Sequence, residues 1–296
     1  MPRSGFVSVV GRPNVGKSTL INRIVGQKVA IVTPKPQTTR NRILAVANTE
    51  RAQIVFFDTP GIHKPKHEMN RLMVESAVSS LKRVELVALM VDITQPLAGA
   101  DEYLLDLVRS VEVPVFLVIN KMDRVPKSRA LPLIDEYRQR YTFAEIIPVS
   151  ALTGDNVPSL VRQLEDYLPE APPLFPEDTL TNLPERFFVS EIIREKIMLH
   201  IREEVPYATA VRIDSWKDGA ELVRIEASIL VERESQKGIL VGSKGSMLKK
   251  IGTAARREIE AFLNAHIYLG LHVKVREHWR ENPRLLAELG MEPPAD

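Results

Sequence analysis

A glycine-rich segment near the start of the chain has the residue types and spacing of a phosphate-binding loop. Residues 11–18, GRPNVGKS, match G-x-x-x-x-G-K-[ST], with a short apolar run before them and a helical pattern after them. Such a loop curls so that its N–H groups converge on an anion, and the helix N-terminus adds positive partial charge. We expect Lys17 to reach the β- and γ-phosphates of a nucleotide and Ser18 to coordinate Mg²⁺. The expected nucleotide-binding residues here are Gly11, Arg12, Pro13, Asn14, Val15, Gly16, Lys17, Ser18 and Thr19.

The motif NKMD indicates which base the nucleotide carries. Asn120, Lys121 and Asp123 follow the apolar run VPVFLVI, so they are placed at the C-terminal end of a strand, where open α/β sheets bind ligands. A carboxylate at this place can accept hydrogen bonds from N1–H and the 2-amino group of guanine, and adenine has no such donor pair. After the run EIIPV, Ser150 and Ala151 are expected to close over the base oxygen through their backbone N–H groups. The sequence therefore favours a guanine nucleotide.

Two further segments have residues suited to the γ-phosphate and its metal ion. Asp58, in DTPG after the run IVFF, is expected to hold the Mg²⁺ shell, and the N–H of Gly61 to sense the γ-phosphate. The polar stretch PKPQTTRNR, residues 34–42, contains a threonine that can coordinate Mg²⁺, and we favour Thr39 over Thr38. The predicted metal ligands are thus Ser18, Thr39 and Asp58, and the predicted catalytic residues are Lys17, Thr39 and Gly61.

The elements that must position these residues form an alternating pattern. Short apolar runs (6–10, 54–57, 84–91, 113–119 and 145–149) alternate with helical patterns over 102–110, 127–141 and 157–168. Fully apolar strands between amphipathic helices predict an α/β domain with a mostly parallel sheet covered on both faces. We place this domain at residues 1–168 and, because residues 169–185 hold five prolines, interpret those as an extended linker.

The order of elements changes after the linker. A helix over 186–204 precedes strands over 208–216 and 222–233, then two helical segments and a strand over 266–275, which is an α-β-β-α-α-β pattern. This predicts a smaller α+β domain at 186–278, followed by a tail at 279–296 with a short helix. Trp279, at the start of the tail, is interpreted as a packing residue, with stacking on a nucleic-acid base as the alternative.

A second glycine loop, GSKG at 242–245, stands between the two helical segments of this domain. It lacks the GK[ST] ending, so it is not a second Walker-type phosphate-binding loop. Residues 237–257 hold six basic side chains and no acidic one, although the net charge of the whole chain is only +2. A G-x-x-G turn lets a nucleic-acid backbone approach closely, and bases can lie in an adjacent apolar groove. The expected RNA-binding residues are Gly242, Ser243, Lys244, Gly245, Lys249 and Lys250.

Composition limits the remaining classes. The chain has no cysteine, which excludes disulfides and thiolate metal sites, and no apolar run approaches the ~20 residues of a membrane-spanning helix. With no secretory signal pattern, cytoplasmic residence is the expectation.

The set GRPNVGKS, QTTRN, DTPG, NKMD and SA resembles the translation-factor-related GTPases, and the second half resembles the prokaryotic (type II) KH domain. One GTPase domain joined to one KH domain is similar to the Era family over essentially the full chain, with SEIIREK (190–196) adding to the match. This resemblance implies a GTPase using GTP/GDP and Mg²⁺, and we expect a monomer. It also implies binding near the 3′ end of 16S ribosomal RNA, assistance to small-subunit assembly, and loose contact with the cytoplasmic membrane face.

The residue after DTPG carries separate information. Many small GTPases have a water-orienting Gln there, but this chain has Ile62, so slow intrinsic turnover is expected. In similar GTPases without the Gln, an Asn at the place of Asn14 accompanies a K⁺ ion; a loop-stabilising role is the equal alternative. The sequence leaves two other functions open: a membrane-linked signalling or cell-cycle GTPase whose basic domain binds protein or lipid, and a nucleotide-dependent RNA remodelling enzyme.

Overall fold

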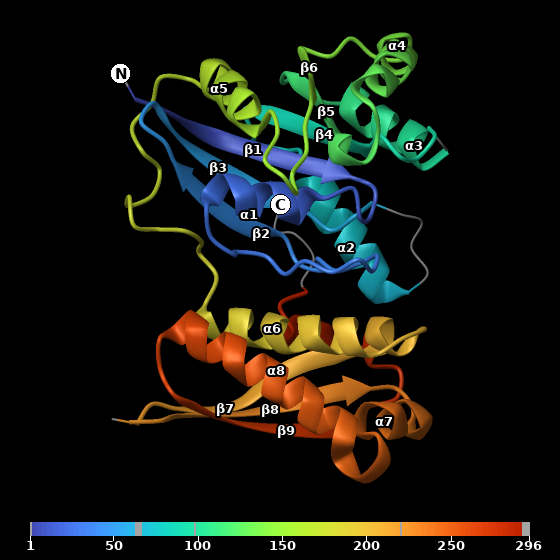
Figure 1. Ribbon diagram of the computed structural model, residues 1–296, viewed down its shortest axis with the longest axis vertical. Coiled ribbons are helices and arrows are strands. Elements are labelled where there is room, and N and C mark those ends of the chain that lie inside the picture. Colours follow the sequence, from blue (N-terminus) through green and yellow to red (C-terminus); the bar gives the residue numbers. More distant parts are fainter. Residues whose placement is uncertain (1, 63–66, 98, 220, 292–296) are drawn as a thin grey trace. The chain divides into compact units, whose positions relative to one another are not determined.

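The computed structural model describes residues 2–62, 67–97, 99–219 and 221–291, and these form two compact units (Figure 1). The first unit consists mainly of residues up to Asn182, and the second begins at Leu183. Each unit has its own sheet: six strands in the first and three in the second. The predicted fold class, an α/β P-loop domain followed by a smaller α+β domain, is confirmed.

The first sheet has the strand order β2-β3-β1-β4-β5-β6. All neighbours pair in parallel except β2, which is antiparallel to β3 and occupies one edge. Every residue of β4 and β5 is buried, as expected for parallel strands with both faces covered. The strands are β1 (Arg3–Gly11), β2 (Ile43–Asn48), β3 (Ala52–Asp58), β4 (Leu86–Asp92), β5 (Val115–Asn120) and β6 (Glu145–Pro148).

Helices cover both faces of this sheet (Figure 1). Alternate residues of β5, such as Leu117 and Ile119, share a core with α2, α3 and α4. Phe116, which points the other way because side chains alternate along a strand, packs edge-on against Tyr167 of α5. The helices are α1 (Lys17–Val25), α2 (Glu68–Ser79), α3 (Gly99–Arg109), α4 (Ala130–Arg138) and α5 (Val157–Tyr167). Strand β2 and helix α2 are additions to the elements that the sequence pattern predicted.

The stretch interpreted as a linker has contacts with the first unit. Residues 169–184 contain no helix and, apart from an isolated bridge between Glu170 and Arg3, no strand pairing. The side chain of Gln53 on β3 accepts from the backbone N–H groups of Leu174 at 2.7 Å and Phe175 at 2.9 Å. The segment therefore lacks a helix but is not extended throughout, because Thr179 donates its N–H to the carbonyl of Pro176 at 3.0 Å in a turn. At least its first part lies along the sheet. Where the flanking domains begin and end stays a prediction.

The second unit follows the predicted order α-β-β-α-α-β. In the sheet β7-β8-β9 the first pair is antiparallel and the second parallel, and α6 and α8 lie side by side on one face (Figure 1). Helix α6 ends at His200 and not at residue 204 as predicted, because Ile201 has an extended backbone. The elements are α6 (Glu185–His200), β7 (Ala210–Lys217), β8 (Val223–Val231), α7 (Glu234–Val241), α8 (Ser246–Leu263) and β9 (Ile267–Val275).

Residues 279–291 pack as part of the second unit. Trp279 is fully buried, and its Nε1 donates to the carbonyl of Ala208 at 3.0 Å. Helix α9 (Pro283–Glu288) follows and buries Leu286 completely. A buried indole cannot stack on a base, so the packing interpretation of Trp279 holds and the stacking alternative is wrong. Residues 292–296 of the predicted tail lie outside the described residues.

Candidate functional site

The first glycine loop joins β1 to α1, as predicted. Gly16 is the N-cap of α1 with φ 106°, a left-handed conformation that favours glycine. A Cβ on Gly16 would also lie 2.3 Å from Asn120 Nδ2, which itself donates to the carbonyl of Val15 at 2.7 Å. The side chain of Asn120 therefore ties the loop to the end of β5, and only glycine leaves room for it.

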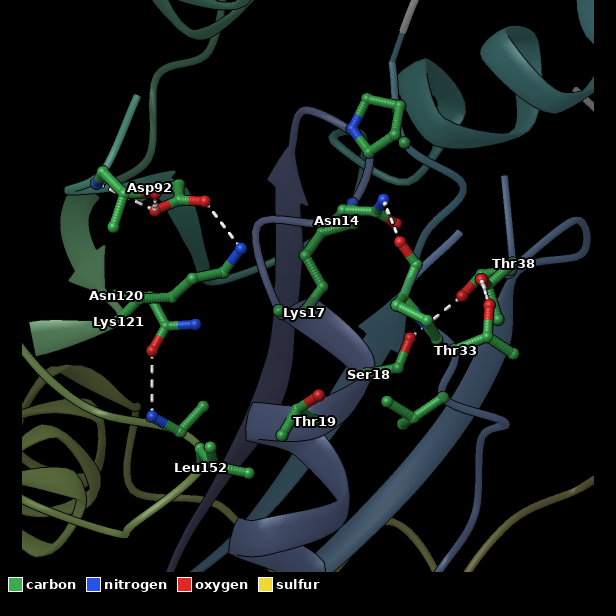
Figure 2. A pocket seen from close by; sticks show the side chains of 18 of the residues that line it. Asn14, Lys17, Ser18, Thr19, Thr33, Thr38, Asp92, Asn120, Lys121 and Leu152 are labelled. Atoms are coloured by element: carbon green, nitrogen blue, oxygen red, sulfur yellow. Dashed lines mark hydrogen bonds and ion pairs between the residues drawn. The ribbon is translucent and has the colours of Figure 1, made fainter. Parts of the chain in front are cut away.

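Lys17 is buried at the centre of this loop (Figure 2). Its Nζ donates to the carbonyls of Gly11 at 3.2 Å and Arg12 at 3.3 Å. Burial lowers the pKa of Lys17 to about 8, and the nearby carboxylate of Asp58 only partly offsets this. A bound anion would favour the charged form, so Lys17 has the position and the electrostatics of a phosphate ligand.

The three predicted metal ligands come together although they belong to three segments of the chain. Ser18 Oγ donates to Asp58 Oδ2 at 2.6 Å and lies 2.9 Å from Thr39 Oγ1, which is 3.3 Å from the same carboxylate oxygen. Burial raises the pKa of Asp58, and its Oδ1 has no hydrogen-bond partner among the residues that the structure describes. Thr38 instead bonds to Thr33 and to the Lys35 carbonyl. A buried carboxylate with an unpartnered oxygen beside two hydroxyls fits a hard cation such as Mg²⁺.

The NKMD motif lies beside the loop at the end of β5. Asp123 accepts a hydrogen bond from Ser150 Oγ at 2.5 Å, which fixes the orientation of its carboxylate. Ala151 donates its N–H to Asn120 Oδ1 at 2.8 Å, and Ser150 donates its own to the carbonyl of Asp155 at 3.0 Å. Both N–H groups thus have partners within the chain, and closure of this segment over the base oxygen stays a prediction. Ser150 also supports Asp123 through its hydroxyl.

Asp92 is a residue of this site that the sequence analysis missed. The last residue of β4, it pairs through Oδ2 with Lys121 Nζ at 2.6 Å and accepts from Thr94 N and Oγ1 through Oδ1 (Figure 2). Burial alone would raise the pKa of Asp92, but the bonds from Lys121 and Thr94 outweigh it and lower the pKa. The pairing depends on β4 lying beside β5, which no local motif reveals.

A cavity of about 560 Å³ lies beside the phosphate loop. Several predicted residues contribute to its wall: Pro13, Asn14, Gly16, Lys17, Ser18, Thr19, Thr39, Gly61, Asn120, Lys121, Asp123 and Ala151. Other predicted residues do not: Gly11, Arg12, Val15, Asp58 and Ser150. Arg12 turns away to pair with Asp101 at 2.7 Å and with Gln95, and Val15 is buried. Wall residues that were not predicted include Thr33, Pro34, Asp92, Thr94, Gln95 and Leu152.

The segment after β3 approaches the phosphate loop closely. A Cβ on Gly61 would lie 2.7 Å from the Cα of Pro13, so only glycine permits this approach. Ile62 donates its N–H to the carbonyl of Gly11 at 3.3 Å, and its side chain is buried in the core. Asn14 donates from Nδ2 to the carbonyl of Pro34 at 2.9 Å, which joins the phosphate loop to the stretch containing Thr39.

The second glycine loop is exposed between α7 and α8. Ser243 and Lys244 are exposed, and Gly242, Lys244 and Gly245 all have positive φ, of 69°, 51° and 79°. A Cβ on Gly242 would lie 2.8 Å from the Cβ of Met247, so the turn requires glycine there. The loop is therefore accessible to a nucleic-acid backbone.

A groove of about 460 Å³ begins at this loop and runs between α8 and β9. Its apolar lining is Leu248, Leu269 and Leu271, and its polar lining is Lys249, Thr253 and Arg256, with Gly245 and Gly252 completing the wall. Lys250 is exposed on the same helix but does not line the groove. The apolar floor of the groove suits stacked bases, and its basic rim suits the adjacent sugar-phosphate backbone.

Comparison with family models gives the class of the protein. Residues 6–121 match the model described as a 50S ribosome-binding GTPase, and residues 204–280 match that of the KH domain. Together with the P-loop, the NKMD motif and the G-x-x-G groove, these matches define a GTPase joined to a KH domain.

Relatives of nearly full length give the family. GTPase Era of Geobacter metallireducens is 53% identical over 290 residues, covering 97% of each chain. Two crystal structures match with 44% identity over 98% of this chain and 99% of theirs. One is Era in complex with MgGDPNP and nucleotides 1506–1542 of 16S ribosomal RNA (TM-score 0.96), and the other is a variant of Aquifex aeolicus Era bound to GDP.AlF4- (TM-score 0.94). The chain belongs to the Era family of GTPases, as the sequence motifs predicted.

Proposed function

We propose that the cavity beside the phosphate loop binds GTP or GDP with Mg²⁺, using the residues that the motifs identified. Lys17 would meet the β- and γ-phosphates, Ser18 and Thr39 would offer hydroxyls to the metal ion, and Asp58 would hold its shell. Support comes from the hydrogen-bonded cluster of Ser18, Thr39 and Asp58 and from the relative crystallised with MgGDPNP. When bound, Mg²⁺ neutralises charge on the β- and γ-phosphate oxygens.

The stretch around Thr39 and the segment after β3 are then the two parts that respond to the γ-phosphate. Thr39 and Gly61 lie in separate loops, and the bond from Asn14 to Pro34 holds the first of these against the phosphate loop. This contact favours the loop-stabilising role of Asn14, and the use of K⁺ stays a prediction. Because Ile62 is buried and apolar, it cannot orient the attacking water. We propose slow unassisted turnover for this reason.

Nucleotide affinity is expected to fall as the pH rises above 8. In the free protein the pKa of Lys17 is about 8, and a bound polyphosphate restores the charged form. Binding therefore takes up a proton above pH 8 but not below it, so affinity falls by up to about tenfold per pH unit there. Calorimetric titration of GDP between pH 7 and 9.5 measures this.

The variant Lys17→Arg separates this effect from titration of the guanine ring. Arginine stays charged over the whole range, whereas ring titration is the same for both proteins. The affinity ratio of the native protein to the variant should be constant below pH 8 and decline above it. A constant ratio up to pH 9.5 would show that Lys17 does not carry the effect.

We also propose that the second unit binds single-stranded RNA from the 3′ end of 16S ribosomal RNA. The observation that carries this is the crystallised relative, which matches this chain over 98% of its length and is in complex with nucleotides 1506–1542 of that RNA. The exposed G-x-x-G loop and the groove between α8 and β9 support the proposal. Gly242, Ser243, Lys244 and Gly245 would hold the backbone while the groove receives bases.

Substituting Asp for both Gly242 and Gly245 should weaken RNA binding and leave GTP binding unchanged. Two carboxylates would repel phosphates, and an Asp at either position would be strained by the positive φ. If the native site neutralises about three phosphates, its log–log salt slope should be about −2 for a single strand. Fluorescence anisotropy with RNA of nucleotides 1506–1542 measures both the affinity and the slope.

Two further double variants distinguish a loss of RNA contacts from a loss of the fold. Lys244→Glu with Lys249→Glu reverses two exposed charges and keeps both glycines of the turn, and Lys217→Glu with Arg202→Glu makes the same charge change at exposed positions that do not line the groove. Only the first pair should lose affinity. If the native protein and the first pair bind RNA equally well, the RNA does not bind in this groove.

The biological role proposed from these two activities is assistance in small ribosomal subunit assembly, with the protein acting as a monomer. Nucleotide state would then set the affinity for RNA. None of the described helices combines the length and apolar composition that a bilayer crossing requires. Cytoplasmic residence and peripheral membrane contact are part of the proposal, the latter through attraction of the basic face to anionic headgroups. Vesicle sedimentation in competition with RNA separates this role from the alternative of a membrane-linked signalling GTPase.

A further inference from the structure

Gly252 occupies a position in α8 where neither the backbone nor the packing calls for glycine. It lies well inside the helix, between Ser246 and Leu263, and is not one of the glycines with positive φ. A Cβ built on Gly252 would meet one atom within 4 Å, Leu271 Cδ1 at 3.4 Å, which is an ordinary contact with a side-chain end. Since glycine inside a helix weakens it relative to alanine, the fold alone would favour alanine here.

The place of Gly252 in the groove gives a reason for the missing side chain. Lys249, Gly252 and Arg256 follow one another at intervals of three or four residues, so they share one face of α8, and they line the groove together with Gly245, the N-cap of the helix. Gly252 therefore exposes bare backbone between two cations. The apolar side chains of Leu269 and Leu271 on β9 complete the wall. A methyl group at this point would project into the space where a bound strand lies.

We propose that Gly252 is a specificity-determining residue of the RNA groove: its bare backbone seats one nucleobase of the bound strand. This rests on the proposed RNA-binding function. Lys249 and Arg256 flank the seat and meet phosphates on either side, while the base lies against the helix backbone and the leucines of β9. A side chain at position 252 lifts that base from the wall and leaves the phosphate contacts in place.

The test uses Gly252→Ala with Gly238→Ala as its matched control. Gly238 is also a helix residue, in α7, where a built Cβ meets no heavy atom within 4 Å, and it does not line the groove. Both substitutions should keep or raise the melting temperature, because alanine is the better helix former. Only Gly252→Ala should weaken RNA binding, by about tenfold, the size of one lost base contact.

A set of RNAs, each lacking one base, shows whether Gly252 contacts one particular nucleobase. RNA of nucleotides 1506–1542 is made with single abasic sites, and each RNA is titrated against the native protein and both variants. The native protein should lose about tenfold at the seated nucleotide. Gly252→Ala should lose no further affinity at that nucleotide, since the contact is already gone. At other bases that contribute to binding, the loss from the abasic site and the loss from the substitution should combine.

Failure of this inference differs from failure of the proposed function. If the variant with Asp at 242 and 245 binds RNA as the native protein does, the proposed function fails. If that variant loses affinity for RNA but Gly252→Ala does not, only the proposed base contact at Gly252 is wrong. The seat is also overturned if Gly252→Ala lowers the melting temperature, if Gly238→Ala weakens binding equally, or if Gly252→Ala shows no coupling to any abasic position.

Discussion

Lys17→Ala is expected to abolish GTP turnover, with a loss of at least about a hundred- to thousandfold, the range seen when one charge-stabilising donor is removed from an active site. Lys17 is buried at the centre of the phosphate loop, with Nζ held by two carbonyls of that loop. Among the residues that the structure describes, Lys121 is the other lysine of the cavity wall, and its Nζ is paired with Asp92 at 2.6 Å. Phosphate release from GTP measures the loss.

Two further variants distinguish lost chemistry from a lost fold. Lys17→Met retains most of the side-chain volume and removes only the ammonium group, so it should be as inactive as alanine while preserving the melting temperature. Lys82→Ala removes an exposed lysine from the same unit and should have full activity. Turnover by Lys17→Met at the native rate would exclude Lys17 from the reaction.

Asp123→Asn is expected to change the preferred base from guanine to xanthine. The carboxylate of Asp123 is oriented by Ser150 Oγ and offers two acceptor oxygens. Asparagine replaces one acceptor by a donor, which opposes the donors of guanine but matches the second carbonyl of xanthine. A site built for specific donors loses about a hundredfold or more when they are mismatched. Competition of GTP and XTP for a fluorescent nucleotide measures the change in preference.

The control for charge is Asp135→Asn, a position on α4 outside the cavity. It makes the same change in net charge and should leave the preference for GTP intact. If Asp123→Asn also keeps that preference, NKMD does not read the base and the assignment of Asn120 and Asp123 to the nucleotide is wrong.

The sequence predicted best the placement of those site residues that lie close together along the chain. The phosphate loop, DTPG and NKMD each pack several functional residues into four to eight positions, and strand–loop–helix context supports them. The preference for Thr39 over Thr38 is matched by the position of Thr39 beside Ser18 and Asp58. Metal coordination itself stays a prediction.

The features that sequence reasoning missed depend on which strands are neighbours. Asp92 pairs with Lys121 because β4 lies beside β5, and Ser150 supports Asp123 because the loop after β6 returns to the end of β5. No local pattern contains both partners of either pair. The packing of Trp279 was predicted, but its hydrogen-bond partner, the distant carbonyl of Ala208, was not.

The central claim is that two separate phosphate-binding sites serve a nucleotide and an RNA strand on one chain. The affinity for RNA of nucleotides 1506–1542, measured on nucleotide-free Lys17→Ala beside the variant with Asp at 242 and 245, tests it most directly. We predict that Lys17→Ala binds RNA as tightly as the nucleotide-free native protein and that the other variant shows a marked loss. A loss in Lys17→Ala as large as in the glycine variant would contradict the claim.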